Sequence, residues 1–134
     1  MKIDGSCHCG HVRYRAEIDP EKVFLCHCTD CQTMSGSAFR IVVPVEESKF
    51  ELLSGGLKDY IKTAESGRRR VQAFCPDCGT HIYATSDGGG PRTLGLRVGA
   101  IRQRTALRPS KQYWTRSAHD WAMDIRALGK VETQ

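Results

Sequence analysis

The sequence predicts a small, mainly β domain with little helix, whose strands are held together by metal ions. Three observations support this prediction. The chain has 134 residues, several short segments alternate apolar and polar side chains, and all seven cysteines lie in short motifs. A chain of this length fits one domain with a modest core, so we expect residues 1–134 to form a single domain.

The first predicted strand shows a period of two. Alternate residues of "HVRYRAEI" (11–18) fall on one apolar face, as in a strand that is buried on one side. These residues are Val12, Tyr14, Ala16 and Ile18. A second strand is expected at 37–45, which is rich in β-branched residues, and Pro44 suits the end or the edge of such a strand. Further strands are expected at 49–53, 58–63, 69–74, 80–85 and 93–99.

Turns are predicted where glycines cluster, in "SGG" (54–56) and "SDGGGP" (86–91). Helical periodicity is scarce, and we expect no more than a turn or one short helix after Cys31. The segment 112–125, which carries both tryptophans, is expected to form loop and strand.

Charge and hydropathy exclude several classes of function. No run of 18 apolar residues occurs, and the N-terminus "MKIDGSCHCG" lacks the apolar stretch of a secretory signal, so we expect a cytoplasmic protein that does not enter a membrane. The formal charge is +5, and it falls to about +2 if seven thiolates bind two Zn²⁺ ions. This small excess does not favour nucleic acid as a partner, even with "RRR" at 68–70, because such a run is usually a solvated face.

The cysteines indicate metal binding rather than disulfides. They occur as two pairs and one triplet: Cys7 and Cys9, Cys75 and Cys78, and Cys26, Cys28 and Cys31. A disulfide framework would pair distant thiols and would usually accompany an export signal. An odd number of clustered cysteines fits metal ligands better.

One closed zinc site can be built from the two pairs. "CPDC" (75–78) forms a tight knuckle that points two sulfurs at one ion, and Gly79 supplies the positive φ that such a knuckle often needs. In an extended "CHC" (7–9) the two cysteines face the same side, whereas His8 points away. Four thiolates would complete the site and would link the N-terminus to a segment far along the chain.

The triplet can bind a second ion and leave its fourth position empty. Three protein ligands and an open position are typical of a catalytic zinc. The alternative is a closed site with a fourth ligand from His81, His27 or Asp30. Because "CHC" occurs at both 7–9 and 26–28, the spacing also allows the two motifs to exchange roles.

The three cysteine motifs resemble those of one family. "SCHCGHVRY" (6–14), "CHCTDCQTMSGSAF" (26–39) and "FCPDCGTHIY" (74–83) are similar to motifs of the glutathione-dependent formaldehyde-activating enzyme family, also called the GFA or centromere protein V domain. The similarity continues more weakly into "LRVGAI" (96–101), "LRP" (107–109) and Trp121. It therefore covers nearly the whole chain.

The resemblance implies a tent-like fold of antiparallel β-sheets and two zinc ions. Cys7, Cys9, Cys75 and Cys78 correspond to the ligands of a structural zinc. Cys26, Cys28 and Cys31 correspond to the ligands of a catalytic zinc. The implied activity is carbon–sulfur chemistry, in which formaldehyde condenses with glutathione to S-hydroxymethylglutathione, or the reverse.

One departure from the family concerns the substrate. The family often has arginine directly after the third cysteine of the triplet, but here Gln32 and Thr33 follow Cys31. If such arginines hold an anionic substrate, Arg40, Arg97 or Arg116 must take their place, and the sequence does not select among the three.

Two main hypotheses of function follow. The first is a zinc-dependent enzyme of the carbon–sulfur lyase type, which acts on a thiol–aldehyde adduct and takes a small glutathione-like thiol as its partner. Three thiolates leave Zn²⁺ with a net charge of about −1, which favours positioning of a thiol over activation of water. The second is a non-catalytic zinc-binding module with a basic surface for an acidic partner or nucleic acid, and redox sensing by the triplet is a weaker third reading. The sequence does not predict the oligomeric state.

Overall fold

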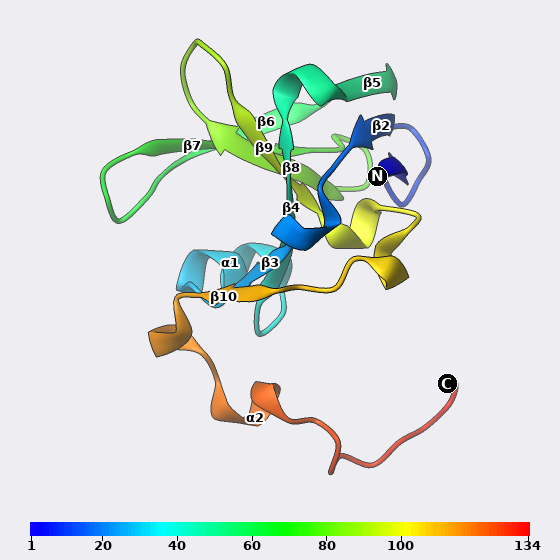
Figure 1. Ribbon diagram of the computed structural model, residues 1–134, viewed down its shortest axis with the longest axis vertical. Coiled ribbons are helices and arrows are strands. Elements are labelled where there is room, and N and C mark those ends of the chain that lie inside the picture. Colours follow the sequence, from blue (N-terminus) through cyan, green and yellow to red (C-terminus); the bar gives the residue numbers. More distant parts are fainter.

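The protein contains two β-sheets and two short helices in the computed structural model, which describes residues 1–134 (Figure 1). The smaller sheet has the order β1-β2-β5, and the larger has the order β10-β3-β4-β9-β8-β7-β6. The strands of the smaller sheet are β1 (Lys2–Ser6), β2 (Arg13–Glu17) and β5 (Phe50–Ser54). Those of the larger are β3 (Phe24–Cys26), β4 (Arg40–Glu46), β6 (Lys58–Thr63), β7 (Arg69–Phe74), β8 (His81–Ser86), β9 (Thr93–Arg97) and β10 (Lys111–Tyr113). The helices are α1 (Thr29–Ser35) and α2 (Asp120–Met123).

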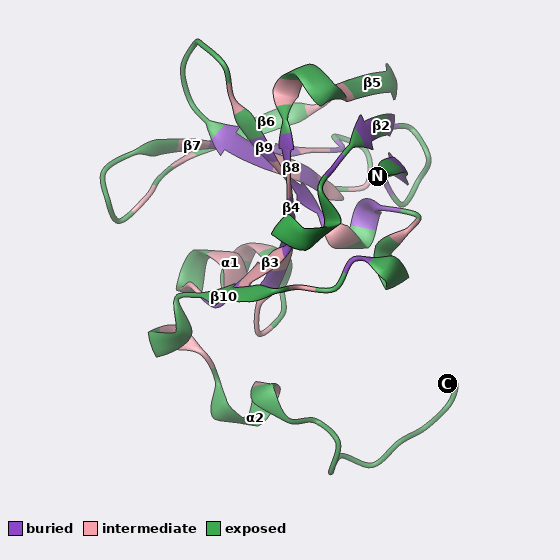
Figure 2. Cartoon of the chain, viewed as in Figure 1, coloured by how far each residue is buried: buried purple, intermediate pink, exposed green.

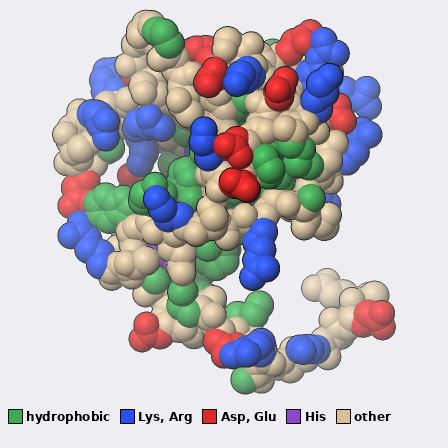
Figure 3. Space-filling model, viewed as in Figure 1, with side chains coloured by type: hydrophobic (Ala, Val, Ile, Leu, Met, Phe, Trp, Pro, Cys, Tyr) green, Lys and Arg blue, Asp and Glu red, His purple; other side chains and the backbone are tan.

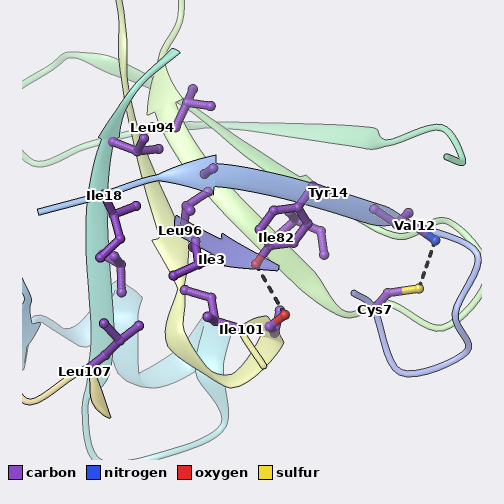
Figure 4. Close-up of a cluster of buried hydrophobic side chains, with 14 of the residues drawn as sticks. Ile3, Cys7, Val12, Tyr14, Ile18, Ile82, Leu94, Leu96, Ile101 and Leu107 are labelled. Carbon is purple, nitrogen blue, oxygen red and sulfur yellow. Dashed lines mark hydrogen bonds between the residues drawn. The ribbon is translucent and has the colours of Figure 1, made fainter. Parts of the chain in front are cut away.

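The core lies between the two sheets. All four apolar residues of the first predicted strand are buried, with exposed fractions of at most 6%. They pack against the inner face of the larger sheet (Figure 4), which contributes Val43, Val45, Ile82, Leu94 and Leu96. Tyr14 spans this core and donates a hydrogen bond from its hydroxyl to the Ala100 carbonyl at 3.3 Å. The prediction of a mainly β fold with little helix is confirmed.

Gly5 makes room for this tyrosine. A Cβ atom at Gly5 would lie 2.0 Å from Cζ of Tyr14, so only glycine fits in β1 opposite this ring. Ile3 is therefore the one large apolar residue on the buried side of β1. With one large apolar residue, β1 shows too little alternation between apolar and polar residues to be predicted from the sequence.

The predicted strands match the structure closely. The predictions at 58–63 and 69–74 have the bounds of β6 and β7, and the others differ by one to three residues at their ends. Pro44 lies inside β4, between β3 and β9, but β3 pairs with β4 only as far as Val42. Pro44 is thus beyond the part of β4 that is bonded on both sides, where its missing N–H is tolerated.

The sequence prediction differs from the structure at the short elements. The helix expected after Cys31 begins earlier, at Thr29, and includes Cys31. The prediction of loop and strand for 112–125 is partly wrong, because only β10 is strand there and residues 120–123 form α2. β10 pairs with β3 in parallel, which is the one parallel pair of the molecule. Elements of three or four residues are too short to show a periodic pattern.

The chain beyond α2 leaves the sheets and is largely exposed (Figures 1 and 2). None of the helices has the length and apolar composition needed to cross a bilayer.

Candidate metal centres

The first cysteine cluster joins the end of β1 to the turn between β7 and β8. The sulfurs of Cys7, Cys9, Cys75 and Cys78 lie within 4.8 Å of one another. Cys9 Sγ is 3.5 Å from Cys7 Sγ and 3.8 Å from Cys75 Sγ. Four thiols at these separations match the donors of a tetrahedral structural zinc.

Backbone hydrogen bonds shape the second half of this cluster. The Gly79 N–H donates to the Cys75 carbonyl at 2.9 Å, and Gly79 has a φ of +73°, as the knuckle requires. The Cys75 N–H donates to the Thr80 carbonyl at 2.9 Å, which closes the turn. The turn therefore places Cys75 and Cys78 side by side.

The surroundings lower the pKa of Cys7 and Cys78. At Cys9 the hydrogen bond with the His11 backbone lowers the pKa, but the hydrogen bonds with the other thiols, chiefly Cys7, outweigh it and raise the pKa to about 12. The Thr80 hydroxyl, 3.1 Å from Cys78 Sγ, is the main cause that lowers the pKa of Cys78 to about 5. The Val12 N–H donates to Cys7 Sγ at 3.2 Å (Figure 4) and helps to lower the pKa of Cys7 against the effect of burial. His8 is exposed, and its backbone N–H donates to the Thr80 hydroxyl at 3.1 Å.

The second cluster is formed by the end of β3 and the first turn of α1. Cys26 ends β3, Cys28 is the N-cap of α1, and Cys31 lies in the first turn. The Cys31 N–H donates to Cys28 Sγ at 3.3 Å, so the start of the helix holds the Cys28 sulfur next to Cys31. The three sulfurs lie within 4.8 Å of one another, and no histidine or carboxylate atom joins them.

None of the three residues considered as a fourth ligand joins the sulfurs of this cluster. His27 is fully buried, and its Nε2 is 2.8 Å from Oε1 of Gln112. His81 stacks on Phe74. Asp30 forms an ion pair with Lys62. The chain thus offers three donors to this cluster and no fourth.

The triplet holds protons that a cation would displace. The nearby Cys26 thiol raises the pKa of Cys31, and burial raises the pKa of Cys28. The hydrogen bond with Cys31 lowers the pKa of Cys26. Three clustered thiols of this kind fit Zn²⁺, because the ion stabilises all three thiolates together.

A cleft of about 610 Å³ opens beside the triplet. Its floor is the outer face of the larger sheet, because strand register brings alternate residues of adjacent strands to the same side. Cys26 lies opposite Arg40, Val42 opposite Arg97, and Gln72 opposite Ala84. Gly95 and Ala84 keep the centre of the floor low. Cys26 and Cys31 therefore face a hollow rather than the core.

The cleft is strongly cationic. Its lining includes two carboxylates, Asp30 and Glu65, and six cationic side chains: Arg40, Lys62, Arg68, Arg70, Arg92 and Arg97. Figure 3 shows Lys and Arg side chains around the hollow on this side of the molecule. Of the arginine run, Arg69 pairs with Asp87 and Arg70 lines the cleft. The run is therefore only in part the solvated face that the sequence suggested.

Two buried arginines lie at the bottom of the cleft. Arg40 and Arg97 are 6% and 9% exposed, and neither forms an ion pair. Both donate to Oε1 of Gln72, Arg97 from Nη2 at 2.9 Å and Arg40 from Nη1 at 3.4 Å. Burial, and after it the nearby Arg40, lowers the pKa of Arg97 to about 9. We call these three residues the Arg40–Gln72–Arg97 cluster.

Arg116, the third arginine considered from the sequence, is outside the cleft. It is exposed, pairs with Glu65 at 3.8 Å and lies over the Trp114 ring at 4.7 Å. Trp114 lines the cleft and has a φ of +57°, which makes it the one residue other than glycine in the left-handed region. The sequence analysis did not predict that Gln72 and Trp114 line a cleft beside the triplet. The alternation of β7, with Arg70 and Gln72 on one face, could have indicated the first.

Gln32, at the position where the family often has arginine, joins α1 to the C-terminal segment. Its Nε2 donates to the His27 carbonyl at 2.7 Å and to the Ser117 carbonyl at 2.9 Å. Its Oε1 is 2.9 Å from Nε2 of His119, whose ring stacks on Trp121. All the polar atoms of this side chain are thus used within the protein.

Comparison with known proteins agrees with this description. The model of a family described as "Glutathione-dependent formaldehyde-activating enzyme" matches residues 2–117. A crystal structure of a Rhodobacter sphaeroides protein has a similar fold, with a TM-score of 0.61 and 20% sequence identity. The match covers 84% of this chain and 99% of that chain.

Proposed function

Since the chain belongs to the glutathione-dependent formaldehyde-activating enzyme family, we propose that it is a zinc-dependent enzyme of the carbon–sulfur lyase type. Its substrate in this proposal is a thiol–aldehyde adduct such as S-hydroxymethylglutathione. The whole chain, residues 1–134, acts as one zinc-binding domain.

In this proposal the two cysteine clusters have different roles. Cys7, Cys9, Cys75 and Cys78 hold a structural zinc that links β1 to the β7–β8 turn. Cys26, Cys28 and Cys31 hold a catalytic zinc. The observation that carries the proposal is the triplet: three thiols without a fourth protein donor face a cleft large enough for a small peptide-like thiol.

The reaction is the cleavage of an S-hydroxymethyl thiol or its formation. In cleavage, the bond between carbon and sulfur breaks, its electron pair stays on sulfur, and the hydroxyl proton passes to water as the aldehyde C=O forms. In the reverse direction, the thiolate attacks the carbonyl carbon and the oxygen takes a proton from water. A zinc ion bound by three thiolates supplies an open position that keeps the substrate sulfur as a thiolate.

The residues of the chain position the substrate in this scheme. Cys28 caps α1, and its neighbours Cys26 and Cys31 in the triplet line the cleft. Trp114 and Met34 supply apolar walls, while the basic residues of the lining attract an anionic thiol. The cleft thus supplies orientation next to the metal site.

The test is turnover of S-hydroxymethylglutathione by zinc-loaded protein, measured above the uncatalysed rate. Cys28→Ser is expected to lower kcat/KM by about 100-fold or more, because one zinc ligand is lost. Thr33→Ala is the matched control, since Thr33 is exposed on the same helix and lies outside the cleft. Turnover that survives in Cys28→Ser at the level of the control would contradict the proposal.

A further inference from the structure

The Arg40–Gln72–Arg97 cluster has hydrogen-bond donors that nothing in the protein accepts. Nη2 of Arg40 and Nε of Arg97 are buried without a partner. The two arginines and His81, whose Nδ1 is also buried without a partner, line an adjoining pocket of about 440 Å³. Buried polar groups are normally satisfied, so two orphaned guanidinium donors in one place point to a missing acceptor.

The positive charge of the two buried arginines is also not balanced by anions of the protein. The three thiolates with Zn²⁺ would carry about −1, whereas the two guanidinium groups carry +2. Both carboxylates of the cleft are paired with other cations, Asp30 with Lys62 and Glu65 with Arg116. Buried cations without a counter-ion are costly, and one monoanion would balance the net +1 of the zinc-loaded triplet and these two buried arginines.

The cluster is also close to the metal site. Arg40 and Cys26 are direct partners across β4 and β3, and such partners have Cβ atoms about 5 Å apart. Arg97 is the next cation along the same face, opposite Val42. A molecule whose sulfur lies at the triplet would therefore have both arginines beside it on the same face of the sheet.

We propose that the Arg40–Gln72–Arg97 cluster binds a carboxylate of the substrate thiol. Planar guanidinium groups match a carboxylate, and Gln72 fixes their orientation through its Oε1. This inference rests on the proposed function for the position of the sulfur. It adds that the enzyme selects anionic thiols such as glutathione over neutral ones, and it assigns to β4 and β9 the selection that Gln32 does not provide.

The experiment compares glutathione with its diethyl ester, which lacks free carboxylates, by calorimetric titration of the zinc-loaded protein. The wild type is expected to bind glutathione at least about tenfold more tightly than the diester. In Arg97→Met this ratio is expected to fall towards one, and Arg97→Lys is expected to restore part of it. Arg108→Met is the matched control, since Arg108 is exposed and lies outside the cleft, so this variant should keep the wild-type ratio.

If the wild type binds glutathione and the diester about equally, the proposal is overturned whether or not any variant folds. It is also overturned if Arg97→Met keeps the affinity ratio of the wild type. Arg40→Met is the second variant, and melting curves identify any variant that is not folded. S-methylglutathione separates the two proposals, because its sulfur cannot become a thiolate. If the protein binds glutathione and S-methylglutathione equally tightly, this contradicts only the claim that the triplet binds a substrate thiolate. The role of the arginines is then still tested by comparing the affinities of the protein for S-methylglutathione and for its diethyl ester.

Discussion

At the scale of single residues, the polar side chains around the triplet are of two kinds. Some have all their polar atoms hydrogen-bonded within the protein, and others keep buried donors without an acceptor. Gln32 uses both ends of its amide within the chain. Arg40 and Arg97 keep buried donors without acceptors. The sequence could name these residues as candidates for substrate contacts. It could not tell which of them line the cleft, because this depends on which side of the sheet each residue faces.

Gln32→Ala should destabilise the protein. The substitution removes three contacts and leaves the His27 and Ser117 carbonyls without this donor. We expect the free energy of unfolding to fall by about 1–3 kcal/mol, measured by urea denaturation. Thr33→Ala, at the exposed neighbour, should change it by less than about 0.5 kcal/mol. An unchanged stability in Gln32→Ala would show that this amide does not tie α1 to the C-terminal segment.

At the scale of elements, long strands were predictable and short ones were not. β6 and β7 show enough alternation to fix their bounds, whereas β3 and β10 have three residues each. These two short strands position Cys26 and the C-terminal segment, so the surroundings of the triplet were the least predictable part of the fold. The cysteine spacing itself was informative, because a short turn brings ligands together whatever the rest of the chain does.

The C-terminal elements should matter up to residue 123 and little beyond. β10 pairs with β3, and Gln112 supplies the hydrogen bond to the buried His27. Removal of residues 111–134 should therefore lower the free energy of unfolding by about 3 kcal/mol or more and weaken zinc binding at the triplet. Removal of 124–134, whose apolar residues are exposed, is the control. Equal stability of the two truncated proteins would contradict this role of β10.

At the scale of the whole molecule, the two sheets serve two purposes. Their inner faces form the core, and the outer face of the larger sheet forms the floor of a cationic cleft. The alternation of strands produces both, since every second residue of β4 and β9 points to the opposite side. The sequence predicted the core face from its apolar residues, but an outer face of arginines, glutamine and glycine resembles an ordinary solvated surface.

Acid should remove zinc from the two clusters in order. At neutral pH the metal-free triplet holds protons on Cys28 and Cys31, whose pKa values are raised, so zinc must displace them. In the other cluster the pKa of Cys78 is lowered to about 5, whereas that of Cys9 is raised to about 12, so thiols of both clusters take up protons as the pH falls. The triplet should lose its ion first, because it supplies three ligands where the other cluster supplies four.

Zinc content measured after equilibration at decreasing pH should thus fall in two steps, with a plateau near one ion per chain. Cys28→Ser, which lacks an intact triplet, should show only the second step. Simultaneous loss of both ions from the wild type would contradict the difference between the sites.

The central claim is that Cys26, Cys28 and Cys31 leave one zinc position open for a substrate thiol, and X-ray absorption at the zinc edge tests it most directly. With two zinc ions per chain, one bound by four thiolates and one by three, we expect an average of about 3.5 sulfur neighbours per zinc. Saturation with glutathione should raise this average to about 4, and S-methylglutathione should not. An average of about 4 before any thiol is added, or an average that glutathione leaves unchanged, would contradict the claim.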